Sequence, residues 1–316
     1  MLGQAGTILL QVLILSNCYY AQSAPITDST PGIKNPPFIK INDRIAKQTT
    51  IIYRTDTLEF KSPRLFNFAK NAPADMWYIA KSPFQKENII GLSAVVASTA
   101  LLIAYDQRIV DWIKNTSEKV SLEPETNYAV LFKMGDTKIV KVPLNVNTTL
   151  YQIGEGGSSM MLAGGIWIYG KIAHNYRAIA TASDLAETFV AMGALTQVIK
   201  RISGRESPFV ATAQGGRWKP FPSFAEFQRN TPSYDAFPSG HLATLTATLT
   251  VLAYNYPEKK WIRPVGYVIM GLSSWAMMNT EVHWPGDYPL AIAVGYLSGK
   301  ITTLRHKKIT TLKTVP

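Results

Sequence analysis

Cysteine is almost absent from this chain, whose one cysteine, Cys18, lies in an apolar run near the N-terminus. If that run is removed on export, the mature chain holds no thiol, which excludes disulfide bonds and thiolate metal sites. The sequence also lacks an HExxH pair, an Asp-rich cation loop and a glycine-rich loop of the phosphate-cradling type. We therefore expect no metal ion and no other cofactor.

Acidic residues are scarce, with 21 Asp and Glu against 32 Lys and Arg, so the net charge is +11. A basic surface suits nucleic acid, anionic lipid headgroups or phosphorylated small substrates. The chain has neither metal-binding Cys/His pairs nor a basic zipper, so we expect no nucleic-acid partner. A phosphorylated substrate and a membrane surface remain as the expected partners.

The N-terminal region divides into two parts. Residues 7–15 form a short apolar run, and the small residues of 21–24 follow it. This pattern is typical of a secretory signal peptide covering residues 1–24, with an uncleaved anchor as the alternative. Residues 25–87 are rich in Pro, Thr, Lys and Asp and predict an irregular extension. The main domain is expected over residues 88–310.

Six stretches of the main domain have helical apolar patterns. They cover residues 89–114, 156–171, 177–201, 240–255, 261–280 and 286–304. Residues 116–150 between the first two stretches read as a loop with a hairpin around Gly135 and Asp136. The sequence thus predicts an all-α fold, a bundle of about six core helices with an irregular N-terminal extension.

Two signals conflict over the membrane. Asp184 and Glu187 lie in the middle of the stretch 177–201, which is costly in lipid. The basic turn of residues 259–263 is typical of a cytoplasmic face, yet six spans after a cleaved signal peptide would put residues 200–240 there instead. We expect an exported bundle, either soluble in the periplasm or attached to the membrane of the bacterial envelope, with its active site facing the periplasm.

The residues of greatest chemical interest form three short segments, 200–208, 237–241 and 283–287. In the last, Asp287 follows His283 by four residues at the start of a helix. One helical turn lets the carboxylate reach a ring nitrogen of His283, fix its tautomer and stabilise the imidazolium. The other ring nitrogen is then free to act as a nucleophile.

The middle segment predicts an anion site. His241 follows Ser239 and Gly240 at the start of a helix, where free N–H groups bind anions. A histidine at that place can protonate a leaving oxygen. Lys200 ends another helix and supplies a positive charge, or simply complements the helix dipole. For His174 and His306 we expect ordinary surface or core roles.

In this order, the three segments resemble the motifs KxxxxxxRP, PSGH and SRxxxxxHxxxD of the type 2 phosphatidic acid phosphatase family. That family includes bacterial class A acid phosphatases and vanadium haloperoxidases, and the resemblance covers about residues 88–305. It implies a metal-independent phosphoric ester hydrolase acting on a phosphate monoester or diphosphate, of a lipid in the reading we favour. By position, His283 would be the nucleophile forming a phosphohistidine, and His241 the general acid. Asp287 would orient His283, while Lys200, Ser239 and the Gly240 amide would bind phosphate.

Both arginines that hold phosphate in this family are missing from their usual positions. The first falls on Ser207, and the Ser-Arg pair of the third motif falls on Ala276 and Met277. Ser or Met does not replace a bidentate guanidinium. We expect Arg205, two residues before the vacated position, to supply the clamp, and Arg201 to lie on the outer face of its helix.

Three functions therefore compete. An active phosphatase with a remodelled phosphate pocket leads, because His283, His241 and Asp287 are all present. The missing arginines favour instead a non-catalytic envelope protein of the same fold that binds phospholipid or phosphate. A vanadate-dependent haloperoxidase is disfavoured, because trianionic vanadate needs several cations.

Overall fold

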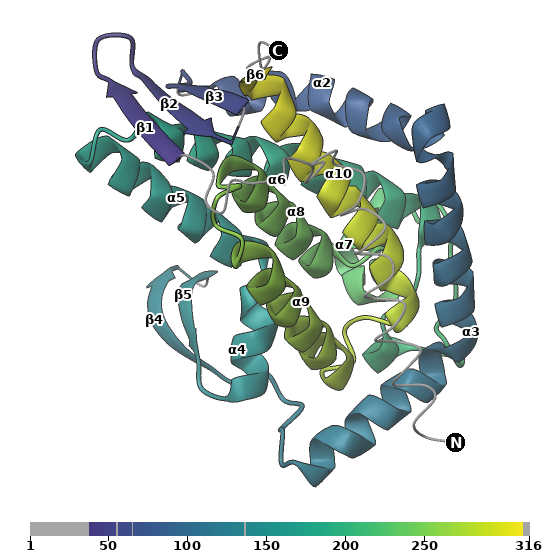
Figure 1. Ribbon diagram of the computed structural model, residues 1–316. Coiled ribbons are helices and arrows are strands. Elements are labelled where there is room, and N and C mark those ends of the chain that lie inside the picture. The colour runs from purple at the N-terminus through teal and green to yellow at the C-terminus, as the bar shows by residue number, and fades with distance from the viewer. Residues whose placement is uncertain (1–37, 55, 65, 136, 312–316) are drawn as a thin grey trace.

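The computed structural model describes residues 38–311 apart from residues 55, 65 and 136. The predicted signal peptide, with Cys18, lies outside the described residues. The described chain is mostly helical (Figure 1). Its helices are α2 (Asn67–Lys81), α3 (Ile89–Lys119), α4 (Val146–Ile153), α5 (Gly156–Ile172), α6 (Tyr176–Ser203), α7 (Phe224–Arg229), α8 (Gly240–Asn255), α9 (Ile262–Asn279) and α10 (Tyr288–His306). Its strands are β1 (Phe38–Asp43), β2 (Gln48–Tyr53), β3 (Asp56–Lys61), β4 (Tyr128–Met134), β5 (Thr137–Pro143) and β6 (Lys308–Thr311).

The largest apolar core lies among α3, α6, α8, α9 and α10. Fully buried side chains from four of these helices meet there, including Leu102, Leu242, Met277 and Tyr288. The closest helix pair is α8 and α10, because glycine lets the two backbones touch. A Cβ added at Gly295 would lie 2.3 Å from the Ala243 carbonyl oxygen, so an alanine there has no room. This pair fixes the starts of α8 and α10 relative to each other.

The predicted all-α bundle is confirmed. Helices α3, α5, α6, α8, α9 and α10 cover the six predicted stretches, and their bounds differ from the prediction by at most a few residues. The predicted hairpin is also present, because β4 and β5 pair antiparallel on either side of Gly135. The helices match because a 3.6-residue apolar period is a strong signal over three or more turns.

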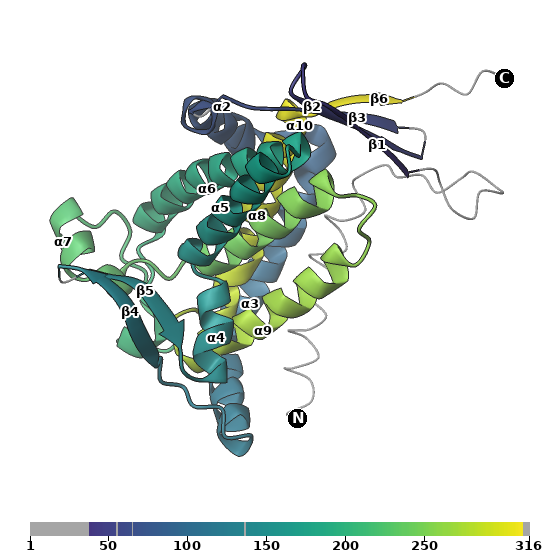
Figure 2. The same ribbon diagram turned by 90° about the vertical axis from the view of Figure 1, so that its left-hand side faces the viewer.

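The N-terminal region contains more regular structure than its composition indicated. Strands β1, β2 and β3 form an antiparallel sheet with the C-terminal strand β6, in the order β1-β2-β3-β6. In β2, Thr49 and Ile51 are buried while their neighbours are partly exposed, which is the alternation of a strand with one face covered. Figure 2 shows this sheet at one end of the bundle and the β4–β5 hairpin towards the other.

Two of the described helices are long and apolar enough to cross a membrane. They are Lys86–Lys119, which includes α3, and Tyr176–Ser203, which is α6. Core helices of soluble proteins also meet this criterion. More than half of the apolar window of α6 is buried inside the bundle, whereas only 17% of that of α3 is. Helix α3 is therefore the more membrane-like of the two.

Candidate active site

The three segments of interest come together at the end of the bundle opposite the N-terminal sheet. Helix α6 ends there at Ser203, and α8 and α10 begin there (Figure 1). Gly204 turns the chain out of α6 with φ of +58°, and a Cβ at this position would lie 1.8 Å from the Lys219 carbonyl oxygen. Only glycine fits this left-handed position, so the sequence after Lys200 is constrained by sterics as well as by chemistry.

His283 is buried behind His241, and its two ring nitrogens have different partners. Nδ1 lies 2.9 Å from the carbonyl oxygen of Ala236 and 3.6 Å from Oδ2 of Asp287. A carbonyl only accepts, so Nδ1 bears the proton and Nε2 has a free lone pair. Burial, together with the nearby charge of Lys200, lowers the pKa of His283 to about 3. The imidazole is therefore neutral at neutral pH, as a nucleophile must be.

His241 stands at the first turn of α8, beside the free nitrogen of His283. Its Nδ1 lies 3.3 Å from Nε2 of His283, and its ring packs against Tyr151 at a centroid distance of 4.8 Å. Burial, followed by the influence of His283 and Lys200, lowers the pKa of His241 well below its ordinary value. The two histidines thus form a neutral pair in direct contact.

Lys200 and the start of α8 provide the positive charge and the free donors. The Lys200 ammonium is buried, lies 3.4 Å from Oδ2 of Asp235, and would lie 3.7 Å from a Cβ added at Gly240. The Ser239 hydroxyl accepts from the Leu242 amide and so caps α8. The amides of Gly240 and His241 precede any intrahelical acceptor and point towards an incoming anion.

Arg205 lies behind Asp287, and its guanidinium is fully buried. One terminal nitrogen donates to Oδ1 of Asp287 at 2.7 Å, and the other donates to Asp106 and to the Gly215 carbonyl. The indole rings of Trp218 and Trp284 pack against it, 4.8 and 5.4 Å from the guanidinium carbon. The guanidinium thus braces the carboxylate next to His283, where we had expected it to face phosphate.

Asp106 is the member of this arrangement that sequence reasoning missed. It lies on α3, is almost fully buried, contacts Arg205, and accepts a 2.7 Å hydrogen bond from the Gly286 amide. The signal was an acidic residue directly after the apolar run 89–105, whose function became visible only with its distant partners in place. Burial raises the pKa of both Asp106 and Asp287 to about 6, and the Arg205 charge opposes that rise.

A cavity of about 440 Å³ opens in front of His241, between the start of α5, α6 and α8. Its lining includes Lys200, Gly240 and His241 at one end and Glu155 at the start of α5. Among the residues that the structure describes, no arginine lines it. The positions vacated by the family's arginines, Ser207, Ala276 and Met277, are all buried.

The remaining arginines near the first motif point elsewhere. The Arg201 side chain donates to the carbonyl and side-chain oxygens of Gln197 and packs over the ring of Phe227. Arg217 and Arg229 are exposed. Lys200 is therefore the one strong cation in the described lining of the cavity.

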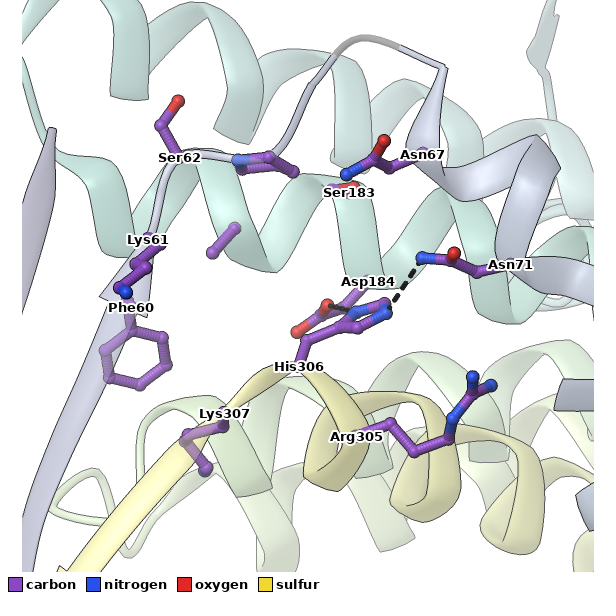
Figure 3. Close-up of a pocket in the computed structure, with 12 residues that line it drawn as sticks. Phe60, Lys61, Ser62, Asn67, Asn71, Ser183, Asp184, Arg305, His306 and Lys307 are labelled. Atoms are coloured by element: carbon purple, nitrogen blue, oxygen red, sulfur yellow. Dashed lines mark hydrogen bonds and ion pairs between the residues drawn. The ribbon is translucent and has the colours of Figure 1, made fainter. Parts of the chain in front are cut away.

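The other two histidines lie far from this cavity. His174 is exposed at the turn between α5 and α6. His306 ends α10 and lines a cavity of about 330 Å³ beside the N-terminal sheet. Its Nδ1 lies 2.9 Å from Asp184, and Asn71 is also in contact with the ring (Figure 3). Its Nε2 lies 3.2 Å from Glu187. His306 therefore ties α10 to α6 and α2.

The arrangement suits phosphoryl transfer: a neutral imidazole with an oriented free nitrogen, a second imidazole beside it, and a lysine with helix-start amides. Within the described part of the chain, no group of three or more His, Cys, Asp or Glu side chains has a geometry that could hold a metal ion.

Comparison with known proteins gives one match, to a family model. No curated protein and no solved structure matches the chain. Residues 181–310 match the family model described as PAP2 superfamily, a stretch that begins within α6 and ends in β6. It includes Lys200, His241, His283 and Asp287. Over residues 181–310 the sequence is therefore consistent with membership of the type 2 phosphatidic acid phosphatase superfamily, which includes phosphatases and related phosphoesterases.

Proposed function

We propose that this protein is a phosphatase that hydrolyses a phosphate monoester or diphosphate of a lipid through a phosphohistidine at His283. The observation that supports this most directly is that His283, His241 and Lys200 come together beside one cavity. The neutral state of His283 and the carbonyl partner of its Nδ1 supply a nucleophile that is already oriented.

In the first step, Nε2 of His283 attacks phosphorus and the bond to the leaving oxygen breaks. His241 gives its proton to that oxygen, so the alcohol or lower phosphate leaves neutralised. Positive charge then develops on His283, where Asp287 and the Ala236 carbonyl stabilise Nδ1–H. Lys200 and the amides at the start of α8 hold the equatorial oxygens.

In the second step, water attacks the phosphohistidine and His241 takes up its proton. The nitrogen–phosphorus bond breaks, and inorganic phosphate leaves with His283 neutral again. Because a phosphate dianion favours nearby positive charge, its arrival raises the pKa of His241 and makes it an acid when one is needed.

The two histidine rings must move apart before this reaction. A phosphoryl group flanked by an attacking and a protonating nitrogen separates them by about 6 Å or more, whereas the two nitrogens are 3.3 Å apart. The His241 ring must therefore rotate away from His283 towards the cavity. His241 is partly exposed and His283 is buried. The ring of His241, the general acid, therefore moves, while the ring of His283, the nucleophile, keeps its position.

A lipid substrate and a place at the envelope membrane belong to the same proposal. The exposed apolar surface of α3 supports membrane association, and a basic chain suits a phosphorylated lipid. The N-terminal apolar run supports export, with the site facing the periplasm.

The non-catalytic alternative is favoured by one observation, the lack of arginine in the described lining of the cavity. Phosphoryl transfer places charge on three oxygens, and Lys200 alone neutralises little of it. In that case the cavity binds phosphate or phospholipid without turning it over.

The deciding experiment compares wild type with His283→Asn on an aryl phosphate and on detergent-dispersed phosphatidate, and assays acid-labile, alkali-stable phosphate on the protein. In His283→Asn we expect turnover to fall by about a thousandfold or more, and we expect the acid-labile phosphate on the protein to disappear. His174→Asn is the matched control, because His174 is exposed and its φ of +49° suits asparagine. Full activity of His283→Asn would exclude this nucleophile. Phosphate binding without turnover by wild type would select the non-catalytic alternative.

A further inference from the structure

A small basic cavity lies at the end of the bundle away from the candidate active site. The loop between α8 and α9 encloses it together with the end of β2, and its volume is about 170 Å³. Four cationic side chains and two tyrosines line it: Arg54, Lys259, Lys260, Arg263, Tyr53 and Tyr256. Among the described residues, no Asp or Glu is part of the lining.

The acidic residue of this loop is engaged elsewhere. Glu258 receives two hydrogen bonds from the Arg177 guanidinium, at 3.0 and 2.7 Å, and both side chains are nearly buried. Arg177 also donates to the Asn255 carbonyl and packs over the Tyr256 ring. The loop is thereby held rigidly, with its carboxylate turned into the protein and its two lysines exposed.

An exposed apolar stripe begins beside this cavity and runs along α9. Trp261 precedes the helix and is 61% exposed, and Val265, Val268 and Leu272 follow it with exposures of 45 to 61%. Their spacing of four, three and four residues puts all four side chains on one helix face. The opposite face of α9 carries Met270 and Met277 into the core.

We propose that the basic cavity binds the headgroup of an anionic phospholipid and docks the protein on a membrane, with Trp261 and the α9 stripe against the lipid. The cations match the charge of the headgroup, and the cavity volume suits a single phosphate with part of its glycerol. Tryptophan is enriched where a protein meets the boundary between headgroups and acyl chains. A soluble anion would account for the cations but leave the exposed apolar stripe unexplained.

This docking surface is separate from the catalytic chemistry. His241 lies in the first turn of α8 and the cavity lies at the last turn of the same helix, so the two are about 20 Å apart along the helix. The inference does not require the protein to be a phosphatase, because its measurement is binding.

The test is flotation of the full-length protein with vesicles of pure phosphatidylcholine and with vesicles containing one third phosphatidylglycerol. Wild type should prefer the anionic vesicles, and Lys259→Gln/Lys260→Gln should lose that preference by about thirtyfold, since each lysine near an anionic surface contributes about fivefold. Trp261→Ala should weaken binding to both kinds of vesicle. The matched control is Lys70→Gln/Lys133→Gln, two exposed lysines on α2 and β4.

Circular dichroism and turnover of a soluble aryl phosphate check that the variants fold. Equal binding of wild type and Lys259→Gln/Lys260→Gln to anionic vesicles would overturn the proposal. An equal loss in the control pair would overturn it too, because general charge and not this cavity would then drive binding. The proposal would also be overturned if the wild-type protein bound vesicles with and without phosphatidylglycerol equally. Absent phosphatase activity in every protein would contradict the proposed function and leave this result intact.

Discussion

Arg205 lies close to the candidate site, as predicted, but it contacts two carboxylates and not the phosphate-binding cavity. Its guanidinium joins Asp287 to Asp106, so it supports the group that supports the nucleophile. A buried ion pair of this kind is strongly destabilised when one partner is removed, because the other charge is left alone. We therefore assign Arg205 a positioning role within the proposed mechanism.

This role gives a prediction about pH. The pKa of Asp287 is raised to about 6 by burial, and the Arg205 charge holds it from rising further. In Arg205→Gln the pKa of Asp287 therefore rises, less of the carboxylate is ionised at a given pH, and the acid limb of the rate profile moves to higher pH. Turnover above that limb should also fall, because Asp287 loses the hydrogen bond that holds it next to His283.

The measurement is the pH dependence of kcat and KM on an aryl phosphate, with Arg201→Gln as the control. Arg201 contacts Gln197 and Phe227 and should behave as wild type. A higher KM with an unchanged acid limb would instead identify Arg205 as a phosphate clamp.

Some contacts of these residues could be predicted from the sequence, and others could not. Asp287 lies one turn from His283 along the chain, so their proximity was predictable. The shorter contact of His283 is with the Ala236 carbonyl, which comes from a loop 47 residues away. Asp106 and Gly286 are 180 residues apart. Contacts between distant segments depend on how the helices pack, which local pattern does not encode.

Among the helices, α10 has its C-terminal end held in place by the ion pairs of His306. His306 lies between Asp184 and Glu187, and hydrogen bonds to these carboxylates raise its pKa to about 9 against the effect of burial. A raised histidine pKa means that its stabilisation is complete below the ordinary value of 6.5 and is lost as the pH rises through about 9. This anchor holds α10 on α6 and next to the N-terminal sheet.

We predict that His306→Asn lowers the free energy of unfolding by about 2 kcal/mol at pH 7 and that the difference from wild type disappears above about pH 9. Urea unfolding at pH 6 to 10 measures this. Lys307, whose pKa burial lowers to about 8, titrates in the same range, but it contributes to both proteins and cancels in the difference. His174→Asn should match wild type throughout. A difference that stayed constant up to pH 10 would mean that His306 acts without its charge.

Helices could be predicted from the sequence where their apolar pattern extends over several turns. Helices α6 and α8 have several turns of apolar residues, and their predicted bounds were close. Strand β3 has six residues and gains its partner β6 from the other end of the chain. Its alternation is too short to stand out from a loop, so the sheet was missed.

For the whole molecule, we predict that the proposed reaction proceeds without a metal ion, because the sequence shows no metal-ligand spacing. The proposed site relies on Lys200, helix-start amides and two histidines for every charge that phosphoryl transfer develops. We predict that millimolar EDTA leaves turnover of an aryl phosphate unchanged. Loss of activity on chelation, with recovery on adding Mg²⁺ or Zn²⁺, would contradict this. The comparison requires protein purified without metal-affinity resin, so that no carried-over ion obscures the result.

The pairing of β6 with β3 has a consequence for how the protein is made. Residues 308–311 complete a sheet in which the neighbouring strand β3 lies about 250 residues earlier, so a ribosome adds all of those residues before this strand exists. Until then β3 is an open edge, with backbone groups that can pair with a neighbouring nascent chain. Strand β6 thus acts as a late closure that protects the edge of β3 from aggregation.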